Sequence, residues 1–186
     1  MPRVSEINSD GNNPMLASIF KKDQDTFGSL RNSTKVMAHC PPILVAARQL
    51  ADAIEVSGQL PKAMLPLLYV RVATINACSF CIDINSARLA ATEGGTEKLG
   101  EIINWRESNV FSAAERVALE YAERITITGG EVDEAFFNQL KAYFTDPQIV
   151  ELTAAIAMEN FRSKFNPAMG IEDQGFCILP TKPKLG

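Results

Sequence analysis

Helical spacing of apolar residues, sustained over more than a hundred positions from about Pro42, most limits what this chain can fold into. Apolar residues recur at intervals of three and four, and no strand-like alternation of useful length interrupts them. Turn and cap residues divide the pattern. The helices expected are 43–56, ended by Gly58; one from Pro61 to about 75; 81–93, ended by Gly94-Gly95; one capped by Thr96 and running to Trp105; one with a capping box from Ser112 to Glu115; 132–144; and a long one from Asp146-Pro147. The spacing therefore predicts an all-α protein.

The length and net charge of the chain limit the number of domains and the classes of partner that we expect. The 186 residues suit one domain, with a formal net charge of −4 that favours neither nucleic acid nor an anionic membrane surface. We expect a flexible leader with a first short helix over 1–34, a helical domain over 35–166 and an extended tail over 167–186. There is no apolar run of about 18 residues for a membrane helix and no apolar signal-peptide core in the polar first 14 residues. We therefore expect a cytoplasmic protein with no membrane partner.

The sequence Cys78-Ser79-Phe80-Cys81 is the clearest chemical signal, within a total of only four cysteines. Two residues between cysteines allow a small disulfide ring, and a helix N-terminus would favour the reactive thiolate. This arrangement suits peroxide reduction or disulfide exchange. Two other interpretations stay open: a pair of small buried hydrophobic side chains, or half of a zinc site completed by His39 and Cys40.

Four further residues receive simpler interpretations. Arg71 is the only charge between Met64 and Cys81, and we expect it to be ion-paired or to extend its charged end to the surface. His39 is followed by Pro41-Pro42, so a structural or surface role is favoured over pairing with a cysteine. Cys177 is expected to be a lone thiol, and Trp105 to lie in the core or at a subunit interface.

The surroundings of the cysteine pair extend the signal over most of the chain. Ahead of and through the pair, residues 60–92 read LPKAMLPLLYVRVATINACSFCIDINSARLAAT, followed by Gly94-Gly95, by Trp105-Arg106-Glu107-Ser108 and by FSAAER at 111–116. In this order, over about 35–165, the chain resembles the carboxymuconolactone decarboxylase family, and within it the AhpD-like alkyl hydroperoxidases. The resemblance implies an AhpD-like helical bundle that forms trimers or hexamers. It also implies thiol-dependent peroxidase chemistry.

Position by position, the resemblance assigns candidate catalytic roles. Cys81 matches the peroxidatic cysteine and Cys78 the cysteine that resolves its sulfenic acid. The family histidine, four residues after the second cysteine, is Asn85 here; it stands one helical turn from Cys81, where its amide could hydrogen-bond the sulfur. A glutamate twelve residues before the first cysteine in the best-known members is Pro66 here. Asp83 and Glu55 are the nearby carboxylates that could replace it.

The expected function is thus a peroxidase or disulfide oxidoreductase that uses Cys78 and Cys81. Its partners would be a peroxide substrate and a thiol electron donor, with no bound cofactor and no metal. One alternative is a helical binding or assembly protein that keeps the fold with weakened catalysis, as the departures at Asn85 and Pro66 suggest. A less favoured alternative is a carboxymuconolactone-type decarboxylase, because that chemistry does not need a dithiol.

Overall fold

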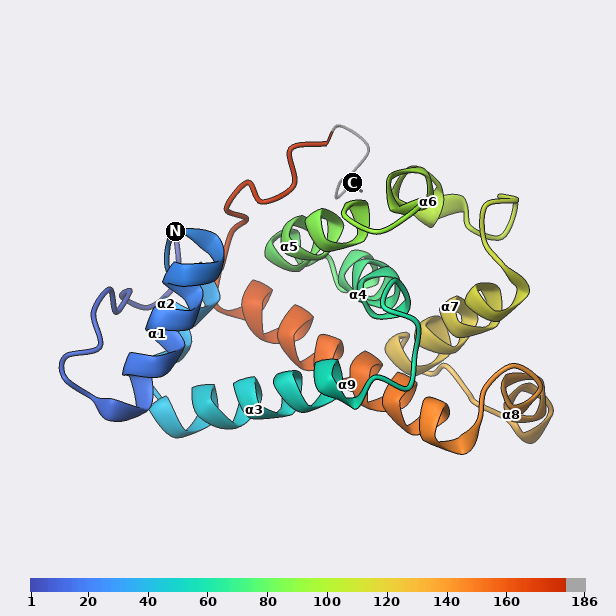
Figure 1. Cartoon of the computed structure of the whole chain (residues 1–186), viewed down its shortest axis with the longest axis horizontal. Coiled ribbons are helices and arrows are strands. Elements are labelled where there is room, and N and C mark those ends of the chain that lie inside the picture. The colour runs from blue at the N-terminus through green and yellow to red at the C-terminus, as the bar shows by residue number, and fades with distance from the viewer. Residues whose placement is uncertain (180–186) are drawn as a thin grey trace.

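The computed structural model describes residues 1–179, and every regular element within them is helical (Figure 1). The elements, in chain order, are α1 (Pro14–Phe27), α2 (Asn32–Met37), α3 (Pro41–Ser57), α4 (Met64–Ile75), α5 (Ser79–Ala90), α6 (Gly95–Glu101), the 3₁₀ turn η1 (Ile102–Asn104), α7 (Ala113–Thr126), α8 (Glu134–Lys141) and α9 (Asp146–Ala168). The all-α prediction is confirmed. Among the described residues, no helix is long and apolar enough to cross a lipid bilayer.

Helix α4 forms the centre of the molecule. All its residues from Met64 to Val70 are buried, and it packs against α5, α7 and α9 (Figure 1). Such a helix must be apolar on every side, which explains why Arg71 is its only charge. Leu67, Leu68 and Tyr69 are fully buried. This central helix fixes the start of α5, where the cysteine pair lies.

The predicted ion pairing of Arg71 is confirmed, with Glu123 of α7 as its partner. Arg71 Nη2 lies 2.6 Å from Glu123 Oε1, which also accepts a hydrogen bond of 2.8 Å from Trp105 Nε1. Arg106 Nη2 lies 2.5 Å from the other carboxylate oxygen. Burial alone would raise the pKa of Glu123, but the hydrogen bonds from Arg106, Trp105 and Arg71 bring it below its usual value. Trp105 is therefore a core residue, tied to α7 by its indole N–H.

One predicted cap is wrong, and the reason lies in the glycine pair. Gly94, not Thr96, is the N-cap of α6, and its φ of 67° lies in the left-handed region that favours glycine. At Gly95, a Cβ atom would come within 1.8 Å of the Leu89 carbonyl oxygen. The first glycine thus allows the turn, and the second allows two backbone segments to approach closely.

The chain before α3 contains two helices, where the sequence suggested a single short one. Helices α1 and α2 are separated by Gly28, which ends α1 in a left-handed conformation. At the other end, α9 runs two residues into the predicted tail, to Ala168, and residues 171–179 follow without helix. The rest of that tail, from residue 180, lies outside the described residues. The division at 34 and 166 stays a prediction.

Candidate functional site

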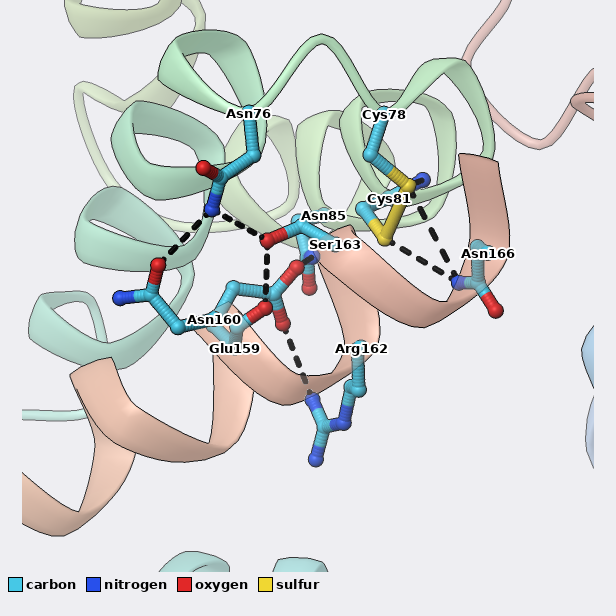
Figure 2. The surroundings of a disulfide bond; sticks show 9 residues. All are labelled: Asn76, Cys78, Cys81, Asn85, Glu159, Asn160, Arg162, Ser163 and Asn166. Carbon is cyan, nitrogen blue, oxygen red and sulfur yellow. Dashed lines mark hydrogen bonds and ion pairs between the residues drawn. A yellow bond between two sulfur atoms is a disulfide. The ribbon is translucent and has the colours of Figure 1, made fainter. Parts of the chain in front are cut away.

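A disulfide joins Cys78 and Cys81 at the start of α5 (Figure 2). The turn from α4 passes through Ala77, whose φ of 52° is unusual for a residue other than glycine, and delivers Cys78 as the N-cap of α5. Cys78 Sγ accepts a hydrogen bond of 3.2 Å from the Cys81 backbone N–H. The two Cα atoms are 5.3 Å apart, a separation typical of bridged cysteines. The pair is thus bridged within one helical turn, as the spacing predicted.

Helix α9 supplies a polar partner to the sulfurs. Asn166 Nδ2 donates to Cys81 Sγ at 3.2 Å and lies 3.9 Å from Cys78 Sγ (Figure 2). The Asn166 side chain is buried, and its Oδ1 has no hydrogen-bond partner among the described residues. An amide N–H directed at sulfur stabilises negative charge there, because a thiolate accepts hydrogen bonds better than a neutral thiol.

Asn85 faces a buried carboxylate and not the sulfur. Its Nδ2 donates to Glu159 Oε1 at 3.4 Å, while Arg162 Nη1 donates to the other oxygen of Glu159 at 3.2 Å (Figure 2). The hydrogen bond to Cys81 anticipated for Asn85 is therefore replaced by one to α9. The helical spacing was sound, but a carboxylate is a stronger acceptor than sulfur and lies within reach of the amide.

Burial raises the pKa of Glu159 into the physiological range. The side chain is fully buried, and this raises the pKa of Glu159 to about 7, against the opposing effect of Arg162. A carboxyl group with such a pKa can both give and accept a proton near neutral pH. It thus has the protonation behaviour that an amide at Asn85 lacks.

A cavity of about 900 Å³ connects these groups with the outside of the chain. Helices α1, α2, α3, α5 and α9 provide its walls, and Cys81, Asn85, Glu159, Arg162 and Asn166 all line it. Cys81 itself is only 2 % exposed, and Cys78 is fully buried and does not line the cavity. Of the two cysteines, only Cys81 therefore borders the cavity.

The carboxylates suggested as replacements for the family glutamate lie elsewhere. Asp83 is buried and accepts hydrogen bonds from the backbone N–H groups of residues 174, 176 and 177, which hold the C-terminal segment. Glu55 pairs with Arg88 at 2.7 Å on the cavity wall. Pro66 is buried within α4. Glu159, on a different helix, is the carboxylate beside Asn85.

Neither His39 nor Cys40 joins the cysteine pair. His39 is exposed, with its Nε2 2.8 Å from the Ser5 carbonyl oxygen, and Cys40 is an exposed free thiol. Within residues 1–179, no group of three or more His, Cys, Asp or Glu side chains is arranged to hold a metal ion. The favoured interpretation of His39 as a surface residue is confirmed. Cys177 is a free, buried thiol, as expected for a lone cysteine.

Sequence reasoning missed Glu159, Arg162 and Asn166 of α9, although a signal for Glu159 and Asn166 was present. Ile156, Glu159, Ser163 and Asn166 follow one another at steps of three and four, so they share one helix face. All four are buried, and the face changes from apolar to polar at Glu159. Polar residues that continue the buried face of a helix indicate a buried polar site, because burying such groups without partners is costly.

Comparison with known proteins identifies the family. The model of the carboxymuconolactone decarboxylase family matches residues 41–124. The Escherichia coli K12 protein YnjA is 42 % identical over 116 residues, which cover 62 % of this chain and 64 % of YnjA. The Bacillus subtilis 168 protein YdfG is 31 % identical over 106 residues, 56 % of this chain and 71 % of YdfG. The chain belongs to the carboxymuconolactone decarboxylase family.

Solved structures show the same fold over nearly the whole chain. The AhpD-core protein from Ralstonia eutropha JMP134, a peroxidase-related protein, superposes with a TM-score of 0.77 at 22 % identity, covering 91 % of this chain and 90 % of that one. The debrominase Bmp8 gives a TM-score of 0.82 at 21 % identity and covers 94 % of each chain. The AhpD-like fold predicted for this member of the carboxymuconolactone decarboxylase family is thus confirmed.

Proposed function

We propose that this member of the carboxymuconolactone decarboxylase family is a thiol-dependent oxidoreductase that reduces a peroxide at Cys81. The observation that carries the proposal is the Cys78–Cys81 disulfide, of which only Cys81 lines the cavity. A bridged pair of which one cysteine borders the cavity suits a cysteine that meets substrate and a second that resolves the product.

The reaction has two steps on the protein. The Cys81 thiolate attacks one peroxide oxygen, the O–O bond breaks, and the leaving oxygen takes up a proton to become an alcohol or water, which leaves sulfenic acid on Cys81. The Cys78 thiol then attacks that sulfur, and water leaves as the disulfide forms. A dithiol donor reduces the disulfide and restores both thiols.

Glu159 and Asn166 take supporting roles in this scheme. The amide N–H of Asn166 on Cys81 Sγ stabilises the attacking thiolate. Glu159, with its pKa of about 7, holds a proton in the same cavity as the leaving oxygen. General acid catalysis of this kind contributes about 10²–10⁴-fold to a rate. These two residues would compensate for the histidine and glutamate that the family pattern places at Asn85 and Pro66.

Cysteine variants test the proposal. With a dithiol donor present, Cys81→Ser should reduce peroxide consumption to the uncatalysed rate. Cys78→Ser should accumulate sulfenic acid on Cys81, because the resolving thiol is missing. Cys40→Ser is the matched control, since this free cysteine lies outside the pair, and it should consume peroxide as the native protein does. Peroxide consumption and mass spectrometry of the oxidised peptides are the measurements.

One result would overturn the proposal. If Cys78 and Cys81, once reduced in the folded protein, both stay reduced under excess peroxide, the chain is not a thiol peroxidase. The alternative is then a helical binding or assembly protein of the same fold, which the departures at Asn85 and Pro66 favour.

A further inference from the structure

The cavity beside Cys81 carries more positive than negative side chains, although the whole chain has a net charge of −4. Five basic side chains line it against four acidic ones: Lys22, Arg31, Arg48, Arg88 and Arg162 against Asp23, Asp52, Glu55 and Glu159. Protonation of Glu159, whose pKa is about 7, increases the excess. Two of the pairs neutralise themselves, Lys22 with Asp52 at 2.8 Å and Arg88 with Glu55 at 2.7 Å. The remaining arginines, Arg31, Arg48 and Arg162, lie against two carboxylates, Asp23 and Glu159, which leaves an excess of one positive charge.

Arg48 is the cation of this group with the weakest compensation. Its Nη2 donates to the Thr34 hydroxyl and lies 3.8 Å from Asp23, whose carboxylate is also bound by Arg31. Arg48 Nε is buried without a hydrogen-bond partner among the described residues. Burial, together with the positive charges of Arg31 and Arg162, lowers the pKa of Arg48 to about 9. A buried donor and a surplus of positive charge both favour an anion in this part of the cavity.

Asn166 provides a second unsatisfied group, close to the sulfur. With its N–H on Cys81, its Oδ1 has no partner in residues 1–179 and points away from the disulfide (Figure 2). The side chain is 2 % exposed and lines the cavity. A buried acceptor without a partner is costly unless a ligand or water donates to it. The O–H of a hydroperoxide, next to the sulfur that it oxidises, is such a donor.

Between these polar groups the cavity walls are largely apolar. They include Ile19, Met37, Phe80, Ile84, Met158 and Phe161. A cavity of about 900 Å³ lies within the range of small-molecule sites, in which apolar walls hold the body of the ligand and a few polar groups orient it.

We propose that the cavity binds a partly apolar organic hydroperoxide that also carries a carboxylate. The carboxylate ion-pairs with Arg48 and Arg162, and the hydroperoxide O–H donates to Asn166 Oδ1. The assignment of the reacting group rests on the proposed function. The Cys81 thiolate attacks the terminal oxygen and becomes a sulfenic acid as the O–O bond breaks, the alkoxide takes up a proton to become an alcohol, and the ligand's carboxylate is unchanged. The Cys78 thiol then attacks the Cys81 sulfur, and water leaves as the disulfide forms. A dithiol donor then reduces the resulting disulfide.

Binding can be measured without any reaction. Calorimetry on the disulfide form compares 4-isopropylbenzoate with the uncharged 4-isopropylbenzamide, which has a similar shape. We expect the carboxylate to bind about tenfold more tightly or better, since a hydrogen bond to a charged group is stronger than one between neutral groups. Arg48→Gln should remove most of this preference by weakening the carboxylate alone. Arg48→Lys keeps the positive charge but loses the planar guanidinium that can bind a carboxylate through two hydrogen bonds. Its preference for the carboxylate should therefore lie between those of the native protein and Arg48→Gln. Arg124→Gln, on α7 and outside the cavity, is the control and should change neither affinity.

A kinetic comparison separates this proposal from the proposed function. The reduced native protein is given cumene hydroperoxide and its 4-carboxyl derivative, and we expect a lower KM for the derivative. Carboxylate binding that depends on Arg48, without peroxide consumption, would keep the anion site and overturn the peroxidase. The anion site would be overturned if the protein consumed both peroxides with equal KM values and bound 4-isopropylbenzoate and 4-isopropylbenzamide with equal affinities. If Arg48→Gln does not fold, as judged by circular dichroism, Arg48→Lys and the ligand pair on the native protein still decide.

Discussion

Glu159 combines full burial with a charge that depends on pH near neutrality. Its pKa is raised from 4.5 to about 7 because burial disfavours the charged form. A group whose pKa is higher in the folded than in the unfolded state stabilises the fold below its unfolded pKa, and this contribution is lost as the pH rises through the folded pKa. The loss falls between about pH 4.5 and pH 7, and at 1.36 kcal/mol per pKa unit it amounts to about 3 kcal/mol.

Glu159→Gln should remove this pH dependence, because an amide does not titrate in this range. The variant should gain about 2.5 kcal/mol relative to the native protein on going from pH 5 to pH 8. Urea unfolding of both proteins at the two pH values, with the disulfide intact, measures the difference. Glu93→Gln, at an exposed glutamate, is the control. An equal response of native protein and Glu159→Gln to pH would show that Glu159 titrates normally.

Residue by residue, the sequence predicted the half of the site that is local. Cys78, Cys81 and Asn85 lie within eight positions, so helical spacing alone brings them together. Glu159 and Asn166 lie more than seventy positions later and meet them only because α9 packs along α4 and α5. That packing depends on the shapes of three buried helix faces, which periodicity does not encode.

Helices were predicted well where caps and periodicity agreed. The capping box from Ser112 to Glu115 is present, with both reciprocal hydrogen bonds, and α7 begins at Ala113. The predicted helix 43–56 corresponds to α3. The predicted helix that begins at Asp146 corresponds to α9. The cap at Thr96 failed because the tertiary approach of Gly95 to Leu89 decided the turn, and no local propensity reports such an approach.

Between elements, Glu123 is the residue whose loss should cost most. It joins α7 to α4 through Arg71 and to the loop after η1 through Trp105 and Arg106. Glu123→Ala would leave the largely buried Arg71 without its ion-pair partner, a loss of about 3–5 kcal/mol in unfolding free energy. Glu120→Ala breaks the more exposed pair with Arg124 and should cost under about 1 kcal/mol. Chemical denaturation at pH 7 compares them, and similar losses would contradict the central role of Glu123.

For the whole molecule, the exposed apolar surface predicts self-association. Ile43 and Leu50 of α3 are each more than half exposed, and their spacing of seven places them along one side of the helix. The family resemblance also implies a trimer or hexamer. We therefore expect light scattering at neutral pH to give three or six times the chain mass of 20.3 kDa.

A charge on this side of α3 should weaken the assembly. Leu50→Glu should lower the measured mass, because a carboxylate in an apolar interface loses its hydration. Val150→Glu, at an exposed apolar residue of α9, is the control and should leave the mass unchanged. A mass near 20.3 kDa for the native protein would rule out the oligomer.

Cys78 has a second role in the molecule, as the N-cap of α5. Helix N-caps commonly use the oxygen of Ser, Thr, Asp or Asn, whose strength as an acceptor is constant. Here the acceptor is a sulfur atom, which accepts weakly in a disulfide and strongly as a thiolate. In the proposed reaction, reduction of the disulfide would therefore change the strength of the hydrogen bond from the Cys81 N–H in the first turn of α5. The hydrogen bond that caps α5 is thus sensitive to the oxidation state of Cys78.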